Sequence, residues 1–225
     1  MRPFGTRHSG PGARRRVGLP GAVLALVAIN LLVEACLAGA DAGWWGSPAW
    51  RTLAYHNGAF WGGLLDNWRP NYPLQPATMF ATYAFLHAGL GHLAGNMLVL
   101  LILGGIVARR AGQGGFVVIY LASAVLGGAA FAVLSDSPQP MVGASGALFG
   151  LAGAWKAWEL DELRAAGLSR WPVWRDIAAL AALNVIFWYL LGGVLAWQTH
   201  LGGFLGGALV STIIGPRHIR PCPGD

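Results

Sequence analysis

The chain has 225 residues, of which 55% are hydrophobic and only 11% are charged, and its formal net charge is +6. A typical soluble domain carries about 25% charged residues. The composition therefore excludes an ordinary soluble globular domain, and its 34 glycines and 11 tryptophans are typical of a tightly packed helical membrane bundle.

Charged side chains are absent from four long stretches of the chain: 70–108, 111–135, 137–155 and 177–216. A membrane-spanning helix needs about 20 mostly apolar residues, and the last stretch is long enough for two. Together with an apolar run near the N-terminus, these stretches predict an all-α membrane protein, a six-transmembrane-helix bundle over residues 19–216. The expected spans are about 22–40, 90–108, 115–134, 145–159, 177–195 and 199–215.

Basic residues cluster at one side of this predicted bundle. They lie before the first span, after the second, between the fourth and fifth, and after the sixth. The positive-inside rule then places both termini in the cytoplasm, with residues 1–18 as a disordered N-terminus and 217–225 as a tail. Topology explains the net positive charge, so we expect no nucleic-acid partner. The Arg-rich, Lys-poor composition favours a bacterial inner membrane.

The first predicted span and the connection after it contain the first notable features. Asn30 and Glu34 lie one helical turn apart, and an acid inside a span is a candidate functional group. Glu34 is near the outer end, where a structural role fits equally well. Residues 41–76 form a long outer connection with five tryptophans, which favour the membrane interface. We expect a long interfacial loop between the first two spans.

Polar side chains with catalytic potential occur inside three of the later spans. His92 and Asn96 lie four residues apart, on one helix face, early in the second span. Ser145 opens the fourth span and His200 opens the sixth. Because spans two, four and six all run from outside to inside, these four side chains are expected at a similar depth in the outer half of the bundle.

Glycines predict that the fourth and sixth spans touch. Small residues four apart let membrane helices approach backbone to backbone. A hydrogen bond of about 2.6–3.2 Å between a serine and a histidine requires helices this close. One turn after the serine, Phe149 is placed to pack against the imidazole. The glycine pairs are Gly146 and Gly150 in the fourth span and Gly203 and Gly207 in the sixth.

These residues could form a serine–histidine dyad, although each has a simpler interpretation. His200 would accept the Ser145 proton and return it to a leaving amine, and His92, Asn96 and the backbone N–H of Ser145 could stabilise an oxyanion. Alternatively, a serine among glycines only packs, and membrane histidines only join helices or bind a metal or haem. The joint pattern, at one depth on three spans, favours the dyad.

The pattern resembles that of the rhomboid intramembrane serine proteases over roughly residues 70–215. The matching motifs are His87-x4-His92-x3-Asn96, Gly143-Ala144-Ser145-Gly146 and His200-x2-Gly203-x3-Gly207. The resemblance implies Ser145 as nucleophile, His200 as base, His92 and Asn96 as oxyanion donors, and no metal or other cofactor. It implies supporting roles for His87, Gly143, Gly146, Phe149, Gly203 and Gly207.

One departure from the family pattern concerns the outer loop. Many members carry a Trp-Arg pair eight or nine residues before the first motif histidine, where this chain has Thr78 and Met79. A Trp68-Arg69 pair occurs ten residues earlier.

The resemblance implies cleavage of transmembrane protein substrates within the lipid bilayer, at a site that opens to the outer or periplasmic side. Gly192 and Gly193, after the fifth span, could hinge a cover over this site. Two alternatives remain at this stage: a non-catalytic rhomboid-like protein that binds or escorts membrane proteins, and a membrane protein whose histidines ligate a metal or haem.

Overall fold

The computed structural model describes residues 18–216, so the expected N-terminal segment, apart from residue 18, and the expected C-terminal tail lie outside the described residues. The described chain is helical, with one isolated β-bridge between Phe60 and Met141. Its α-helices are α1 (Gly21–Asp41), α2 (Ala49–Gly58), α3 (Gln75–Thr82), α4 (Leu90–Val99), α5 (Gly105–Leu134), α6 (Ser145–Ala165), α7 (Trp171–Leu190) and α8 (Trp197–Ser211). The all-helical expectation is confirmed.

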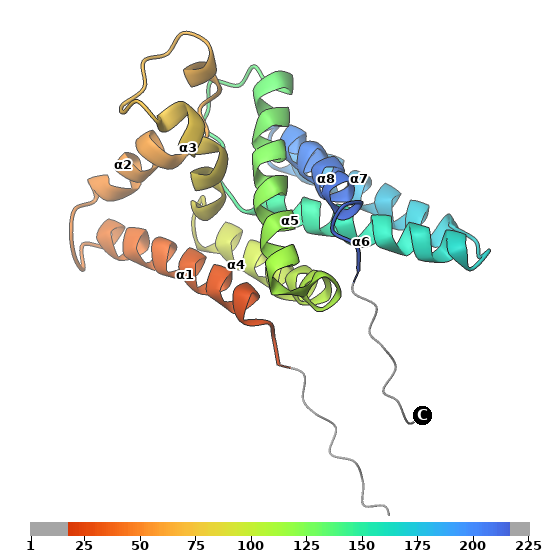
Figure 1. Ribbon diagram of the computed structural model, residues 1–225. Helices are drawn as coiled ribbons and strands as arrows, with labels where there is room; N and C mark the ends of the chain where they lie inside the picture. Colours follow the sequence, from red (N-terminus) through yellow and green to blue (C-terminus); the bar gives the residue numbers. More distant parts are fainter. Residues whose placement is uncertain (1–17, 217–225) are drawn as a thin grey trace, which may run out of the picture.

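Among the described residues 18–216, three helical segments are long and apolar enough to cross a membrane: Gly21–Asp41, Leu90–Leu134 and Trp171–Leu190. The second has 45 residues because α4, a π-helical turn at Leu100–Gly104 and α5 follow one another directly. It is not one rod. Gly112 has φ 77° and ψ 167°, a conformation that glycine adopts readily, and the chain reverses there at the lower end of α5 (Figure 1). Two arms, 90–111 and 113–134, result.

The observed helix ends differ from the expected spans at α6, α7 and α8, and α6 continues six residues beyond the expected range 145–159. The helix α7 begins six residues before the expected range 177–195 and ends five residues before its end. Pro172 in the first turn favours that start, and Gly192 and Gly193, with φ 63° and 85°, end the helix. The helix α8 is likewise displaced toward the N-terminus relative to 199–215. The long connection 41–76 contains α2 and a short 3-10 helix, Gly62–Leu65.

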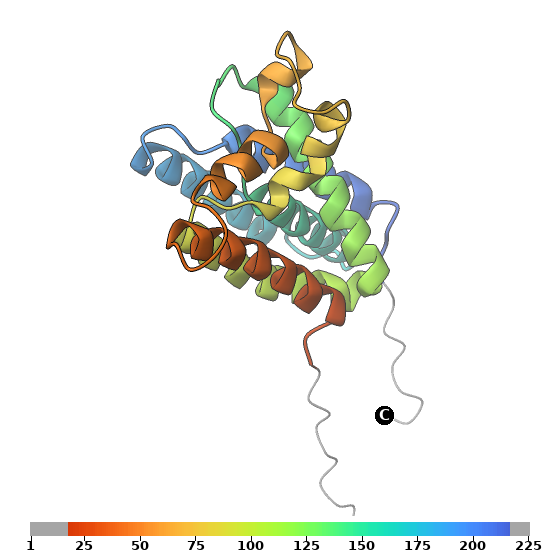
Figure 2. The same cartoon turned by 90° about the vertical axis from the view of Figure 1, so that its left-hand side faces the viewer.

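The helix α8 packs between α5 and α6, and glycines bring the backbones of α6 and α8 into contact (Figures 1 and 2). A Cβ atom at Gly203 would overlap the carbonyl of Gly146, and one at Gly207 would overlap the carbonyl of Gly150. A Cβ at Gly150 would overlap Ser123 of α5. The three helices therefore form a core that tolerates no added side-chain volume at these glycines.

This contact predicts that Gly203→Val separates α6 from α8. The clash is with backbone, so we expect destabilisation of about 1–3 kcal/mol or more, seen as a lower melting temperature of the detergent-solubilised protein. Gly114→Val is the control, because a Cβ at Gly114 meets nothing within 4 Å. Equal melting temperatures for the two variants would show that the glycine contact is not what holds α8.

Candidate functional site

Ser145 and His200 come together from separate helices. Ser145 is the first residue of α6, and His200 lies in the first turn of α8. The Oγ atom of Ser145 is 2.8 Å from Nε2 of His200. The imidazole is 6% exposed and stacks on Phe149, with ring centroids 4.2 Å apart and an angle of 5° between the planes. The hydroxyl and imidazole therefore share a hydrogen bond while the ring is held against an aromatic face.

A third side chain, which the sequence interpretation missed, completes this hydrogen-bonded row. Oδ1 of Asn184, in α7, is 2.6 Å from Nδ1 of His200. A signal was present in the sequence, since Asn184 is the one amide side chain between Asp176 and Gln198 in an otherwise apolar run. The amide oxygen accepts from Nδ1–H, so Nε2 presents its lone pair to the serine hydroxyl.

The candidate oxyanion donors lie on α4, facing the same cavity. His92 and Asn96 line it together with Ser145 and His200, and its volume is about 490 Å³. The Nδ1 atom of His92 accepts the Ala88 N–H at 3.2 Å, so the neutral ring carries its proton on Nε2. The Nδ2 atom of Asn96 donates to the His92 carbonyl oxygen at 3.1 Å.

The segment before Ser145 is shaped by a glycine. Gly143 has φ 124°, and a Cβ there would lie 2.6 Å from Cε1 of His92. The Gly143 N–H donates to the Tyr83 carbonyl at 3.0 Å, and Phe60 and Met141 exchange two backbone hydrogen bonds of 2.9 Å. These contacts fix the approach to α6 against the residues that directly follow α2 and α3. The N–H of Ser145, at the first position of the helix, has no helical carbonyl partner.

His87 packs against His92 and is fully buried. The two rings meet edge to face, with centroids 5.2 Å apart, and neither ring nitrogen of His87 has a partner. Burial, with a further contribution from His92, lowers the pKa of His87 to about 4, so its ring is neutral at pH 7. Within residues 18–216, no group of three or more His, Cys, Asp and Glu side chains is arranged to hold a metal ion.

Arg51 of α2 links the outer segment to the loop before α4, and sequence interpretation missed it as well. It pairs with Glu34 of α1 at 2.9 Å and with Asp41 at 2.6 Å, and Glu34 is only 1% exposed. Arg51 and the Tyr55 hydroxyl both donate to the His87 carbonyl, at 3.3 and 2.7 Å. The hydrogen bond to Glu34 raises the pKa of Arg51, which therefore stays charged.

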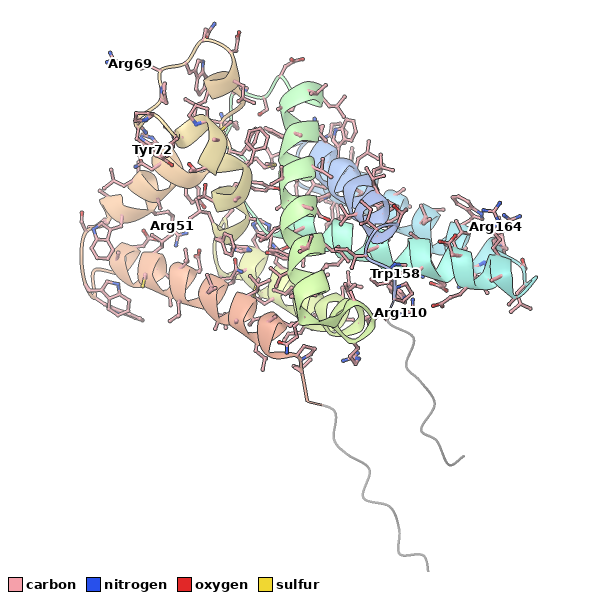
Figure 3. All side chains as sticks on the ribbon, in the orientation of Figure 1. Arg51, Arg69, Tyr72, Arg110, Trp158 and Arg164 are labelled. Atoms are coloured by element: carbon pink, nitrogen blue, oxygen red, sulfur yellow. The ribbon has the colours of Figure 1, made fainter. Side chains whose placement is uncertain are left out.

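The same network shows which outer arginine holds the loop. Arg51 lies between α1 and α2, whereas Arg69 points away from the fold at the tip of the segment before α3 (Figure 3). The Asn30 amide donates to the Leu26 carbonyl of its own helix, at 2.8 Å, rather than to Glu34. Glu34 thus has a structural partner, and the arginine that anchors the outer segment comes from α2.

Comparison with known proteins gives one consistent result. A family model described as "Rhomboid domain" matches residues 75–217, more than half of the chain. The chain is 35% identical over 130 residues to Rhomboid protease GluP of Bacillus subtilis (strain 168), covering 58% of this chain and 24% of that protein. It is 37% identical over 160 residues to RHOMBOID-like protein 6, mitochondrial, of Arabidopsis thaliana, covering 68% and 48%.

The relatives also include a protein whose name says that it is inactive. The chain is 31% identical over 144 residues to Inactive RHOMBOID-like protein 8 of Arabidopsis thaliana, covering 62% of this chain and 36% of that protein. This chain spans less than half the length of each of the three relatives. Similarity alone therefore leaves both an active and an inactive protein open.

The Arg51 network predicts that Arg51→Gln destabilises the protein. It leaves the buried Glu34 carboxylate without its counter-charge, at a cost of about 1–3 kcal/mol, below the value for a fully buried pair because Arg51 is partly exposed. The measurement is the thermal unfolding temperature, compared with that of the control Arg69→Gln, because the Arg69 side chain points away from the fold (Figure 3). A melting temperature for Arg51→Gln that matches that of the control contradicts the anchoring role.

Gly143→Ala should disturb the site locally. Its Cβ would strain the backbone, by about 1–3 kcal/mol, and push the His92 ring out of place. Gly43→Ala separates these effects, since Gly43 has φ 72° but a Cβ there meets nothing within 4 Å. We expect both variants to lose stability and only Gly143→Ala to lose reactivity of Ser145 toward a serine-directed probe. Equal probe reactivity in the two would refute the contact.

Proposed function

The chain belongs to the rhomboid family, and from that premise we propose that it is an intramembrane serine endopeptidase that cuts transmembrane segments of membrane proteins with a Ser145–His200 dyad. The 2.8 Å hydrogen bond between these two side chains is the observation that carries the proposal. A serine alone is a weak nucleophile, and a hydrogen-bonded base activates it. The apolar cavity beside the pair offers space for a hydrophobic peptide segment.

The proposed reaction proceeds by acyl transfer. As Ser145 Oγ attacks the scissile carbonyl carbon, its proton passes to Nε2 of His200. The resulting imidazolium gives this proton to the leaving amine nitrogen, and the C–N bond breaks. A water molecule, deprotonated by His200, then attacks the acyl-serine ester and releases the new carboxyl terminus while Ser145 regains its proton. No cofactor enters this scheme.

His92, Asn96 and the Ser145 backbone N–H are the proposed oxyanion donors. The His92 tautomer with its proton on Nε2 supports this role, because Nδ1 already accepts from Ala88. One donor of this kind contributes about 10²–10³ in rate. Gly143, whose Cα faces the His92 ring, and Phe149, which stacks on His200, would support the arrangement.

We also propose six transmembrane segments with cytoplasmic termini in a bacterial inner membrane and an active site that opens to the outer side. Arm 90–111, arm 113–134 and helices α1, α6, α7 and α8 supply the six segments. Arg110 and Arg164 lie on the opposite side of the fold from Arg51 and Arg69 (Figure 3). Ser145 and His200 lie at the starts of α6 and α8, away from the Arg164 end of α6.

The substrate class follows from the chemistry of the cavity. Its lining includes Leu103, Leu148 and Phe187, so it favours apolar side chains. A helix hides its carbonyl groups in hydrogen bonds, so the substrate must unwind before Ser145 can attack. Glycine or proline near the cut should favour cleavage, because both destabilise a helix. Gly192 and Gly193, at positive φ, would allow the connection between α7 and α8 to move as a cover over the cavity.

The second candidate function is a non-catalytic rhomboid-like protein that binds membrane clients, and the inactive relative motivates it. The hydrogen-bonded Ser145 and His200 favour the enzyme, because a binding protein has no use for an aligned dyad. A histidine-ligated metal or haem protein would instead contain a bound metal and would not depend on Ser145.

Ser145→Ala should abolish cleavage of a model transmembrane substrate and labelling by a fluorophosphonate, because the nucleophile is gone. Ser137→Ala, which changes an exposed loop serine, should keep both. Unfolding temperatures of all three proteins check that the fold survives. Cleavage that persists in Ser145→Ala overturns the nucleophile assignment, and a wild-type protein that neither labels nor cleaves supports the binding protein.

A further inference from the structure

We infer that Asn184 of α7 is a positioning residue that orients His200, so that the site works as a Ser145–His200–Asn184 row rather than as a dyad alone. This inference rests on the proposed function and deepens it. It concerns the group that holds the base in the correct tautomer and rotation. Among residues 18–216, no acidic side chain lines the cavity to do this.

The geometry places the His200 ring under three constraints. Oδ1 of Asn184 is 2.6 Å from Nδ1 on one edge, and Oγ of Ser145 is 2.8 Å from Nε2 on the other. Phe149 covers one face of the ring in a parallel stack. Because an amide oxygen can only accept, Nδ1 must carry the proton and Nε2 must be the free base. This is the tautomer that general-base catalysis requires.

The surroundings of Asn184 indicate that this hydrogen bond is the reason for a polar residue here. The other residues of α7 that line the cavity are apolar: Leu180, Leu183 and Phe187. An amide in such a setting is unfavourable unless it has a partner. Asn184 is partly buried, and it shares a hydrogen bond with the imidazole of His200.

The helix that carries Asn184 is held mainly at its beginning. Val173 is the one buried residue of α7, and Asp176 forms an ion pair of 2.8 Å with Lys156 of α6. Beyond its C-terminal end lie Gly192 and Gly193, both at positive φ. The Asn184–His200 hydrogen bond therefore ties the middle of α7 to α8. A displacement of α7 from the cavity would remove this partner from His200, so the base is fully oriented only while α7 packs beside the cavity.

The test compares Asn184→Ala, Asn184→Asp and Val185→Ala with the wild type. Val185 is the matched control, because it is the next residue of α7 and is 64% exposed, away from the site. The measurements are kcat and KM on a model transmembrane substrate, the rate of fluorophosphonate labelling, the pH–rate profile and the melting temperature. Besides His200, His92 is the titratable side chain that lines the cavity, and it is unchanged in every variant.

We expect Asn184→Ala to lower kcat and the labelling rate about 10-fold or more, a part of the 10²–10⁴ that a general base contributes, with KM within about twofold. Asn184→Asp still accepts from Nδ1–H, so it should restore most of kcat. Its negative charge should favour the imidazolium and move the acidic limb of the profile to higher pH. Val185→Ala should match the wild type.

Two results would overturn the inference alone while the wild type remains reactive. One is wild-type kcat and labelling in Asn184→Ala. The other is an equal loss in the alanine and aspartate variants together with lower melting temperatures, which would mark a structural role. A wild type that does not react with the probe would instead overturn the proposed function, and the inference with it.

Discussion

The backbone contact between α6 and α8 is the constraint on which the rest of the site depends. Gly203 faces the Gly146 carbonyl with no room for a side chain. Gly146 directly follows Ser145, and Gly203 lies three residues after His200. A serine side chain is short, so its hydroxyl can meet an imidazole of another helix only where the two backbones touch. Any larger residue at this contact would open the distance that the 2.8 Å hydrogen bond needs.

Around this contact, the fold limits the movement of each polar group. Phe149 stacks on the His200 ring, and the segment before α6 is fixed by backbone hydrogen bonds from Gly143 to Tyr83 and between Phe60 and Met141. The outer segment is held in turn by Arg51 and Glu34. Such preorganisation matters because a misplaced donor or base loses much of its catalytic effect. By contrast, α7 is lightly packed, which suits an element beside an entrance to the cavity.

Much of this arrangement could be predicted from the sequence, because apolar length and glycine spacing are local signals. Charge-free stretches located the helices, and the Gly203 and Gly207 spacing indicated which face of α8 meets α6. The C-terminal end of α7 was predicted too late because the apolar sequence continues past Leu190, whereas the helix ends there, before Gly192 and Gly193 at positive φ. Arg51 and Asn184 were missed since their partners are 17 and 16 residues away, and no periodicity links such pairs.

The central claim is that one serine hydroxyl is activated by one histidine from another helix. It is tested most directly by mapping where a fluorophosphonate attaches, by mass spectrometry of the digested protein, and by comparing the rate of attachment in wild type and His200→Ala. The account predicts a single adduct on Ser145 that forms far more slowly in the variant. An adduct on another residue, or an unchanged rate without His200, would contradict it.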